Sequence, residues 1–288
     1  MNKDYYRRSI GIVDSDRLAS LRLVVTGVGA GGGQVVDEIG RWGSSVLIID
    51  RPTERLETHN VMRHVLGADA IGEIKHVAMA RHVQRLCPFT SVTSVGIDVL
   101  QERDQYLALL QAFEPHLIFA ATDNEPSKFA IDEIGRILRI PVVGAGVYNG
   151  GVGGEVYLTE PGAACYGCIF EHLQGGSAER HAPQSVDYSN PEQPDVPATA
   201  ALRLDIGQIA GLSLRMAMQR LLAPGQDAFG VPSGANVVVW ANRRVPGVFE
   251  RALTPQWLHI DPDPRCLYCA KGSSPISDPN RNGEKGVA

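Results

Sequence analysis

Short apolar runs alternate with amphipathic segments through the first half of the chain. The runs are rich in Val and Ile and are bounded by polar or glycine-containing stretches, as buried strands are. They cover residues 21–26, 46–49, 91–99, 116–122 and 141–147. The segments between them carry apolar residues at helical spacing and cover residues 34–42, 71–86, 104–113 and 128–138. This alternation predicts a doubly wound, mostly parallel sheet with helices on both faces and a ligand site at the carboxyl ends of its strands.

The second half of the chain departs from this alternation. Residues 150–162 (GGVGGEVYLTEPG) predict a hairpin or strand pair, residues 198–222 a helix and residues 235–243 a strand. Between them, residues 171–197 are polar, contain prolines and have no clear period, which predicts a crossover loop. The expected fold is therefore Rossmann-like with a C-terminal antiparallel extension. Its parts are an N-terminal arm over 1–20, a single domain over 21–272 and a disordered polar tail over 273–288.

Composition limits the classes of partner. The chain has 288 residues, is 44% hydrophobic and 20% charged, and carries a formal net charge of −5 at pH 7. This charge gives no broad attraction to nucleic acid or to an anionic membrane. The N-terminal sequence MNKDYYRRSIG lacks the apolar region of a signal peptide, and no run reaches the roughly 18 apolar residues of a membrane helix. We therefore expect a cytoplasmic protein that binds neither nucleic acid nor membranes.

A glycine cluster, GVGAGGG, follows the first predicted strand. Gly27, Gly29 and Gly32 fill the positions of a G-x-G-x-x-G fingerprint, and Asp50 ends the next strand, 23 positions after Gly27. In this motif the first glycine turns the chain, the second lets a phosphate approach the backbone, and the third lets the helix pack on the strand. The helix N-terminus faces the anion, and Asp50 would accept hydrogen bonds from ribose hydroxyls. The pattern predicts a nucleotide site rather than a merely structural turn.

Four of the five cysteines form two C-x-x-C pairs. CYGC supplies Cys165 and Cys168, and CLYC supplies Cys266 and Cys269. Five cysteines are too few for a disulfide scaffold in so long a chain, whereas two such pairs have the spacing of a closed tetrahedral zinc site. We expect structural Zn²⁺ here, rather than redox thiols or buried apolar cysteines. The metal would tie the C-terminal residues back to the segment that follows the sheet.

The order of the motifs resembles that of one family. GVGAGGG, Asp50, HNVMRH, DAIGEIK, ATDN, PGAACYGC and a C-terminal C-x-x-C look like the motifs of the ThiF/MoeB/HesA adenylyltransferases, which have the fold of ubiquitin-activating enzymes. The resemblance covers roughly residues 5–269. It implies activation of the C-terminal glycine carboxylate of a ubiquitin-like or sulfur-carrier protein with ATP and Mg²⁺, which gives an acyl-adenylate and pyrophosphate. It also implies a homodimer.

The resemblance assigns roles to several polar residues. Arg63 in HNVMRH and Lys75 in DAIGEIK match phosphate-binding positions, and Asp123 in ATDN matches the magnesium ligand, with Asn124 beside it in the nucleotide site. Cations are needed there because a carboxylate that attacks an α-phosphate brings two anions together. Asn60 would position the phosphates or the neighbouring backbone. Outside this register, the basic residues would be solvated surface charges and Asp123 would be a helix N-cap.

The N-terminal arm also matches the family. Arg8 in YYRRSI resembles an arginine that family members often insert into the site of the partner subunit, with Arg7 as the alternative.

The chain departs from the family pattern at two points. The glycine loop reads GVGAGG where relatives commonly have GxGGLG, and the acid pair D-x-D is replaced by DRP at residues 50–52. The second carboxylate is therefore missing, and the segment from Asp50 to Asn60 is about two residues longer than usual. Phosphate contacts near Arg51 and Arg55 would be rearranged as a result.

No cysteine is left for acyl transfer. Cys87 ends a predicted helix before a proline, where we expect a structural role, and residues 171–197 lack the transfer cysteine of many ubiquitin-activating relatives. We expect the reaction to stop at the acyl-adenylate, which passes to an external sulfur donor, amine or thiol. The alternative is an oxyester on a loop hydroxyl activated by a histidine. The candidates are Ser177, Ser185, Ser189 and Thr199, with His172 or His181 as the base.

Three other functions remain open. The same fold could adenylate a different carboxylate, such as a peptide C-terminus or a tRNA-linked carboxylate, because the sequence does not identify an acceptor surface. A nucleotide-binding scaffold without catalysis would account for the altered glycine loop. An NAD oxidoreductase fits less well, because it leaves Arg63, Lys75 and Asp123 without a shared role.

Overall fold

The computed structural model describes residues 4–175, 200–223, 225 and 228–270. These residues form one eight-stranded sheet with the strand order β3-β2-β1-β4-β5-β6-β7-β8. Strands β1 to β5 are parallel, and β6, β7 and β8 continue the sheet with antiparallel pairings. The strands are β1 Arg22–Thr26, β2 Ser45–Asp50, β3 Ser91–Gly96, β4 Leu117–Ala120, β5 Val142–Val147, β6 Gly153–Thr159, β7 Val237–Ala241 and β8 Thr254–Leu258. The predicted fold class, with its C-terminal antiparallel extension, is confirmed.

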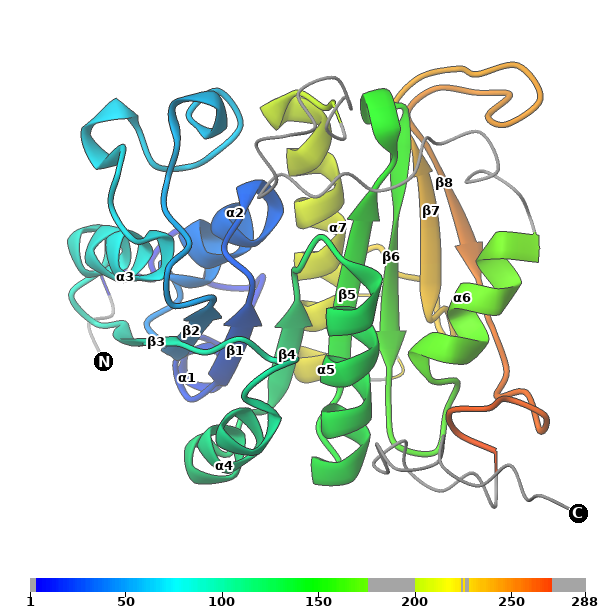
Figure 1. Cartoon of the computed structure of the whole chain (residues 1–288), viewed down its shortest axis with the longest axis horizontal. Coiled ribbons are helices and arrows are strands. Elements are labelled where there is room, and N and C mark those ends of the chain that lie inside the picture. Colours follow the sequence, from blue (N-terminus) through cyan, green and yellow to red (C-terminus); the bar gives the residue numbers. More distant parts are fainter. Residues whose placement is uncertain (1–3, 176–199, 224, 226–227, 271–288) are drawn as a thin grey trace, which may run out of the picture.

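Helices cover both faces of this sheet. In Figure 1, α5 and α6 lie in front of the sheet and α7 lies behind it. The α-helices are α1 Ser15–Ala19, α2 Ala30–Ile39, α3 Lys75–Leu86, α4 Arg103–Phe113, α5 Glu125–Leu138, α6 Tyr166–Gly175 and α7 Arg203–Leu222, and the short 3-10 helices are η1 Thr58–Asn60, η2 Ala68–Ala70 and η3 Asn149–Gly151. The buried apolar clusters follow the same division, with α2, α3 and α7 on one side of the parallel strands and α4 and α5 on the other.

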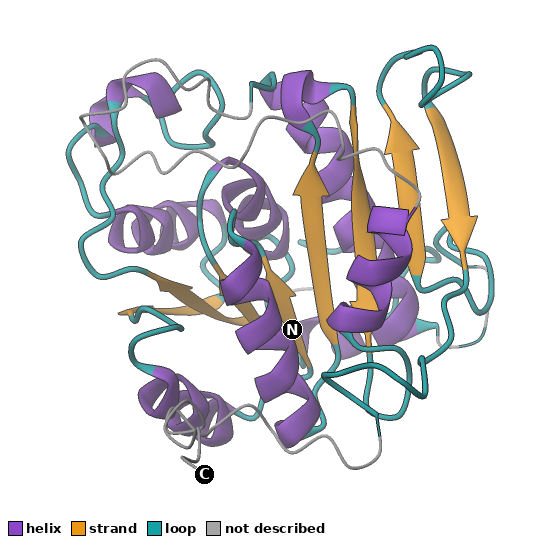
Figure 2. Ribbon diagram, turned by 45° about the vertical axis from the view of Figure 1, so that its right-hand side comes forward, coloured by secondary structure: helices purple, strands orange, loops and turns teal. Residues whose placement is uncertain are grey.

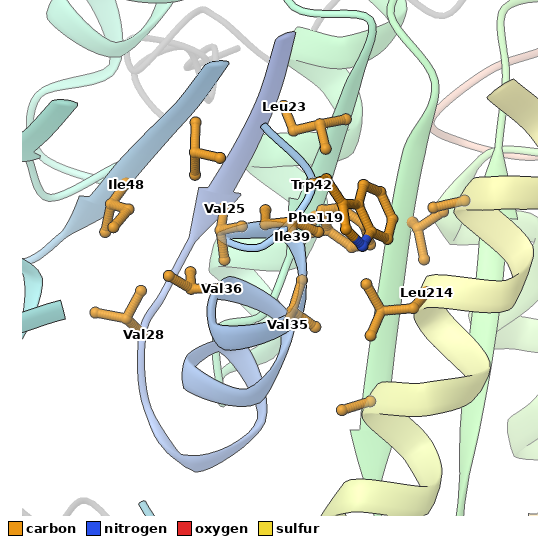
Figure 3. Close-up of a cluster of buried hydrophobic side chains, with 14 of the residues drawn as sticks. Leu23, Val25, Val28, Val35, Val36, Ile39, Trp42, Ile48, Phe119 and Leu214 are labelled. Atoms are coloured by element: carbon orange, nitrogen blue, oxygen red, sulfur yellow. The ribbon is translucent and has the colours of Figure 1, made fainter. Parts of the chain in front are cut away.

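Strand β1 illustrates why the apolar runs are continuous. Leu23 and Val25 belong to the cluster that α2 and α7 complete, and Figure 3 shows Val25 near Val36 and Ile39 of α2, with Leu214 of α7 at the other side of the cluster. Val24, between them in sequence, joins the cluster on the opposite face. Each of these three β1 side chains is fully buried, because a parallel strand with helices on both sides has no solvent-facing residues.

The structure differs from the expected elements at several places. Residues 150–162, expected as a hairpin or strand pair, contain the single strand β6, which pairs with β5 and β7. Helix α3 begins at Lys75 instead of residue 71. Helix α6 extends to Gly175, so residues 171–175 are helical rather than part of the predicted crossover loop. Helix α7 begins at Arg203 instead of residue 198. Strand β8 at the sheet edge was not predicted, because it contains Pro255 and has a largely exposed, polar sequence, TPQWL. Figure 2 shows β7 and β8 as the antiparallel strands that end the sheet.

Several expectations lie outside the described residues. The predicted tail over 273–288 and most of the predicted crossover loop, 176–197, belong to this group. Among the helices that the structure describes, none is long and apolar enough to cross a membrane.

Candidate active site

The glycine turn between β1 and α2 has the geometry of a phosphate loop. Gly27 has φ +89°, and a Cβ on this residue would lie 2.7 Å from the carbonyl oxygen of Ala121 in the loop after β4. A Cβ on Gly32 would lie 2.0 Å from the carbonyl oxygen of Gly27, whereas a Cβ on Gly29 would meet no atom within 4 Å. Gly29 is also the N-cap of α2 and supplies no capping side chain. The first and third glycines therefore allow close packing, and the second faces open space at a helix N-terminus.

This difference between the glycines is testable by replacing each with alanine. Gly32→Ala should lower the free energy of unfolding by about 2–3 kcal/mol or more, because the new methyl group would overlap backbone atoms that cannot move aside easily. Gly29→Ala should cost no more than about 1 kcal/mol, since φ is −67° and the methyl group enters open space. Urea unfolding of both variants measures the difference. Equal losses of stability would contradict the assigned packing of the loop.

Asp50 lies at the carboxyl end of β2, beside the glycine turn. One carboxylate oxygen accepts a hydrogen bond from the Val28 N–H at 3.3 Å, and the other accepts one from the Arg51 N–H at 2.9 Å. Burial raises the pKa of Asp50, while these two N–H groups and the nearby charge of Lys75 oppose that rise. Asp50 therefore fixes the backbone of the glycine loop at the position where a ribose-binding acid is expected.

Lys75 is the first residue of α3 and is buried, with an ion pair to a carboxylate that sequence analysis missed. Its Nζ lies 2.8 Å from Oε1 of Glu54, and the Arg51 guanidinium lies 2.8 Å from Oε2 of the same carboxylate. Glu54 thus places an acid in the segment where the expected second carboxylate is absent. Arg55, in contrast, donates to the carbonyl oxygen of Gly72 at 2.6 Å. No local motif indicated Glu54, because its partners follow from the folding of an irregular segment.

The 3-10 helix η1 and the residues just after it contain two of the predicted residues. The side-chain oxygen of Asn60 accepts a hydrogen bond from the Glu57 N–H at 3.0 Å, which is a contact to neighbouring backbone. Arg63 is half-buried three residues later, and its N–H donates to the carbonyl oxygen of Asn60 at 2.9 Å. Asn60 therefore shapes the short turn that carries Arg63.

Asp123 and Asn124 follow β4, next to the glycine turn. The side-chain oxygen of Asn124 accepts from the Ser127 N–H at 2.9 Å and caps α5. The capping role considered for Asp123 therefore belongs to Asn124, and the Asp123 side chain is exposed at the end of β4. Beside them, the buried hydroxyl oxygen of Thr122 has no hydrogen-bond partner in the described part of the chain. A carboxylate at this position is available to a cation that also binds phosphate oxygens.

The N-terminal arm lies near the amino-terminal ends of the parallel strands, whereas the glycine turn lies at their carboxyl ends. The Tyr5 hydroxyl donates to the carbonyl oxygen of Arg41, and the Tyr6 hydroxyl donates to that of Trp42, just before β2 begins. Arg8 is exposed on this arm, close in sequence to both anchors. The structure therefore does not bring Arg8 to the glycine loop of its own chain.

The two C-x-x-C pairs meet as one cluster. The four Sγ atoms lie within 4.8 Å of one another, and three of the pairs are 3.4, 3.6 and 3.8 Å apart. Four thiolates about 2.3 Å from a central Zn²⁺ would be about 3.8 Å apart, so the donor set fits this ion. The Asp263 N–H also points at the Sγ of Cys168, 3.4 Å away. Burial raises the pKa of Cys165 and raises that of Cys269 to about 11, which disfavours the thiolate forms of both residues. A bound cation would oppose this effect, because it stabilises the thiolates that coordinate it.

The remaining candidates for acyl transfer are distant or undescribed. Cys87 is the C-cap of α3 and is fully buried just before β3, near the amino-terminal ends of the parallel strands. His172 is exposed on α6. Ser177, Ser185, Ser189, Thr199 and His181 lie outside the described residues.

The sequence of the chain matches the model of one protein family, and the match includes the glycine loop, Asp50, Lys75 and Asp123. The model of the ThiF family matches residues 3–235. The chain belongs to the ThiF family. The predicted family is therefore confirmed, and the match takes in the glycine loop, the Lys75 segment and the first C-x-x-C pair.

Curated relatives of this ThiF-family chain carry names of activating enzymes. The chain is 25% identical to the SAMP-activating enzyme E1 of Haloferax volcanii over 222 residues, which are 77% of this chain and 74% of the relative. It is 27% identical to the sulfur carrier protein adenylyltransferase of Thermus thermophilus over 176 residues, 58% of this chain and 63% of the relative. The predicted enzyme class, an ATP-dependent adenylyltransferase, is confirmed.

Solved structures agree with the ThiF-family fold. Escherichia coli MccB aligns with a TM-score of 0.68 at 16% identity, covering 94% of this chain and 73% of that one. PaaA aligns with a TM-score of 0.64 at 14% identity, covering 90% of this chain and 81% of that one. At these identities the likeness establishes the fold alone.

Proposed function

We propose that this ThiF-family enzyme adenylylates the C-terminal glycine carboxylate of a ubiquitin-like or sulfur-carrier protein. The observation that carries the proposal is the open space over Gly29 at the N-terminus of α2, with Asp50 and Asp123 at the ends of the strands on either side. The substrate class follows from the names of the two curated relatives, which refer to SAMP and to a sulfur carrier protein.

In the proposed reaction the carrier carboxylate attacks the α-phosphorus of ATP, forming a carboxyl–phosphate bond while the bond to pyrophosphate breaks. The glycine-loop N–H groups and the cations of Arg63 and Lys75 would offset the charge of the phosphates. Mg²⁺, held by Asp123, would supply further positive charge at the departing pyrophosphate. Lys75, whose Nζ lies 2.8 Å from Oε1 of Glu54, would exchange this ion pair for contact with the phosphates when ATP binds.

The chain's own cysteines do not support a thioester step. Four form the cluster of the two C-x-x-C pairs. Cys87 is buried at the end of α3, near the amino-terminal ends of the strands, whereas the glycine loop lies at their carboxyl ends. We therefore propose that the acyl-adenylate leaves the site by reaction with an external nucleophile.

A homodimer completes the proposal. Arg8 is exposed, and its arm is anchored by Tyr5 and Tyr6 away from its own glycine loop. This placement is compatible with a contribution to the site of a second copy, as the family resemblance implies. A strictly monomeric enzyme with full activity would contradict that role.

Exchange of labelled pyrophosphate into ATP tests the function. We expect exchange only when a small carrier protein ending in Gly-Gly is present, because formation of the adenylate must be reversible and must need the terminal carboxylate. The matched control is the same carrier without its last glycine, which should reduce exchange at least about 100-fold. Measurable ATP binding without exchange for any such carrier would instead favour a nucleotide-binding scaffold.

A further inference from the structure

His64 lies behind the glycine loop and holds its backbone. The side chain is buried, with 2% of its surface exposed. Its Nδ1 accepts a hydrogen bond from the Leu66 N–H at 3.0 Å, and its Nε2 lies 2.8 Å from the carbonyl oxygen of Val28. Because a backbone N–H can only donate, Nδ1 must be unprotonated. The proton of the neutral ring is therefore on Nε2, which donates to Val28.

This hydrogen bond sets the direction of the next N–H along the loop. The carbonyl group of Val28 and the N–H of Gly29 belong to one planar trans peptide unit, so they point in opposite directions. With the carbonyl drawn toward the buried ring, the Gly29 N–H points toward the opposite side. No acceptor among the described residues binds this N–H, and a Cβ on Gly29 would meet only open space.

Two further contacts make the arrangement rigid. The Val28 N–H donates to the Asp50 carboxylate at 3.3 Å, so the peptide units on both sides of Val28 are held. A Cβ on Gly33 would lie 3.3 Å from two atoms of the His64 ring, so the ring also packs against the first turn of α2. Burial lowers the pKa of His64, against the opposing effect of the Val28 bond, and this favours the neutral ring near pH 7.

We propose that His64 is a positioning residue for ATP, which turns the Gly29 N–H toward the nucleotide phosphates through its hydrogen bond to Val28. The inference rests on the proposed function only in taking ATP as the ligand. His64 itself does not touch the nucleotide in this arrangement.

Two substitutions separate the two hydrogen bonds of the ring. The amide nitrogen of Gln can occupy the position of Nε2, so His64→Gln retains a donor for Val28 and loses the acceptor for Leu66. The amide oxygen of Asn can occupy the position of Nδ1, so His64→Asn retains the acceptor for Leu66 and leaves Val28 without a donor. Both variants replace the buried ring with an amide, and because Asn is one methylene shorter than Gln, urea unfolding of both variants is needed to measure the difference in packing.

The expected result is a change in the ATP KM that follows the Val28 bond. For His64→Gln we expect an ATP KM within about threefold of the wild type, and for His64→Asn a rise of about tenfold or more, which corresponds to one weakened hydrogen bond to a charged group. The KM for the carrier protein should be unchanged in both variants. Equilibrium ATP binding, measured without carrier, should show the same order of affinities.

Other outcomes separate this inference from the proposed function. Equal ATP affinities for the two folded variants would overturn the positioning role, because His64 would then act only through packing. The expected order of ATP affinities without any carrier-dependent exchange would leave the role of His64 standing and refute the function. If His64→Asn is too unstable to purify, His64→Gln still decides, since an ATP KM more than about tenfold above the wild type overturns the inference.

Discussion

Replacement of Asp123 by Ala should reduce carrier-dependent pyrophosphate exchange at least about 100-fold without unfolding the protein. The Asp123 side chain is exposed at the end of β4 and makes no hydrogen bond or ion pair with another described residue. Its removal should therefore change the free energy of unfolding by no more than about 0.5 kcal/mol. Activity should fall because the proposed Mg²⁺ site loses a charged oxygen ligand beside the departing pyrophosphate.

A matched control removes a carboxylate at the other end of the fold. Asp16 is exposed in the first turn of α1, which precedes β1 at the amino-terminal ends of the parallel strands. Because the glycine loop lies at the carboxyl ends of these strands, Asp16→Ala should leave exchange unchanged. Asp123→Asn keeps the shape of the side chain and removes its charge, and should raise the Mg²⁺ concentration needed for half-maximal exchange. Exchange within about threefold of the wild type in both Asp123 variants would show that the metal ligand is another residue.

The parts of the site that the sequence predicts are those with a local geometric cause. Gly27, Gly32 and Asp50 could be found because a strand, a tight turn and a helix need particular residues at fixed spacing. The cysteine pairs could be found for a similar reason, although about a hundred residues separate them, because two short C-x-x-C spacings supply a tetrahedral ligand set. Apolar runs buried on both faces likewise identify the parallel strands.

The residues that sequence analysis missed act through contacts without any period. Glu54 joins Arg51 to Lys75, and His64 joins Val28 to Leu66. Both lie between β2 and α3, where the chain forms short 3-10 turns and an isolated β-bridge and the partners are set by tertiary packing. A lone buried His or an acid in a charged segment gives no sequence signal of this kind.

One zinc ion per chain is expected from elemental analysis of the purified protein, and the fold of the C-terminal segment should depend on it. Cys266→Ser should lose the metal and lower Tm on the order of 10 °C, because binding free energy at such a site is also folding free energy. Cys87→Ala is the matched control, since this buried thiol lies outside the cluster and its loss should leave the zinc content unchanged.

The thiols provide a second measurement. In the native protein the four cluster cysteines should resist a thiol reagent, and a strong chelator should make all four reactive together. Absence of zinc, with all four thiols freely titratable in the native protein, would refute the structural site and leave the cluster as buried or redox-active cysteines.

Loss of zinc should loosen the C-terminal part of the fold first. The cysteines belong to an apolar cluster of their own with Tyr157, Val237 and Ile260, distinct from the two clusters that enclose the parallel strands. The second C-x-x-C segment is also attached to α5, because Arg136 donates to the carbonyl oxygen of Tyr268 at 3.0 Å. After chelation, amide hydrogen exchange should therefore accelerate over residues 254–270 before it changes in β1, β2 and β4. Simultaneous loss of protection in both regions would mean that the metal supports the whole sheet rather than its C-terminal extension.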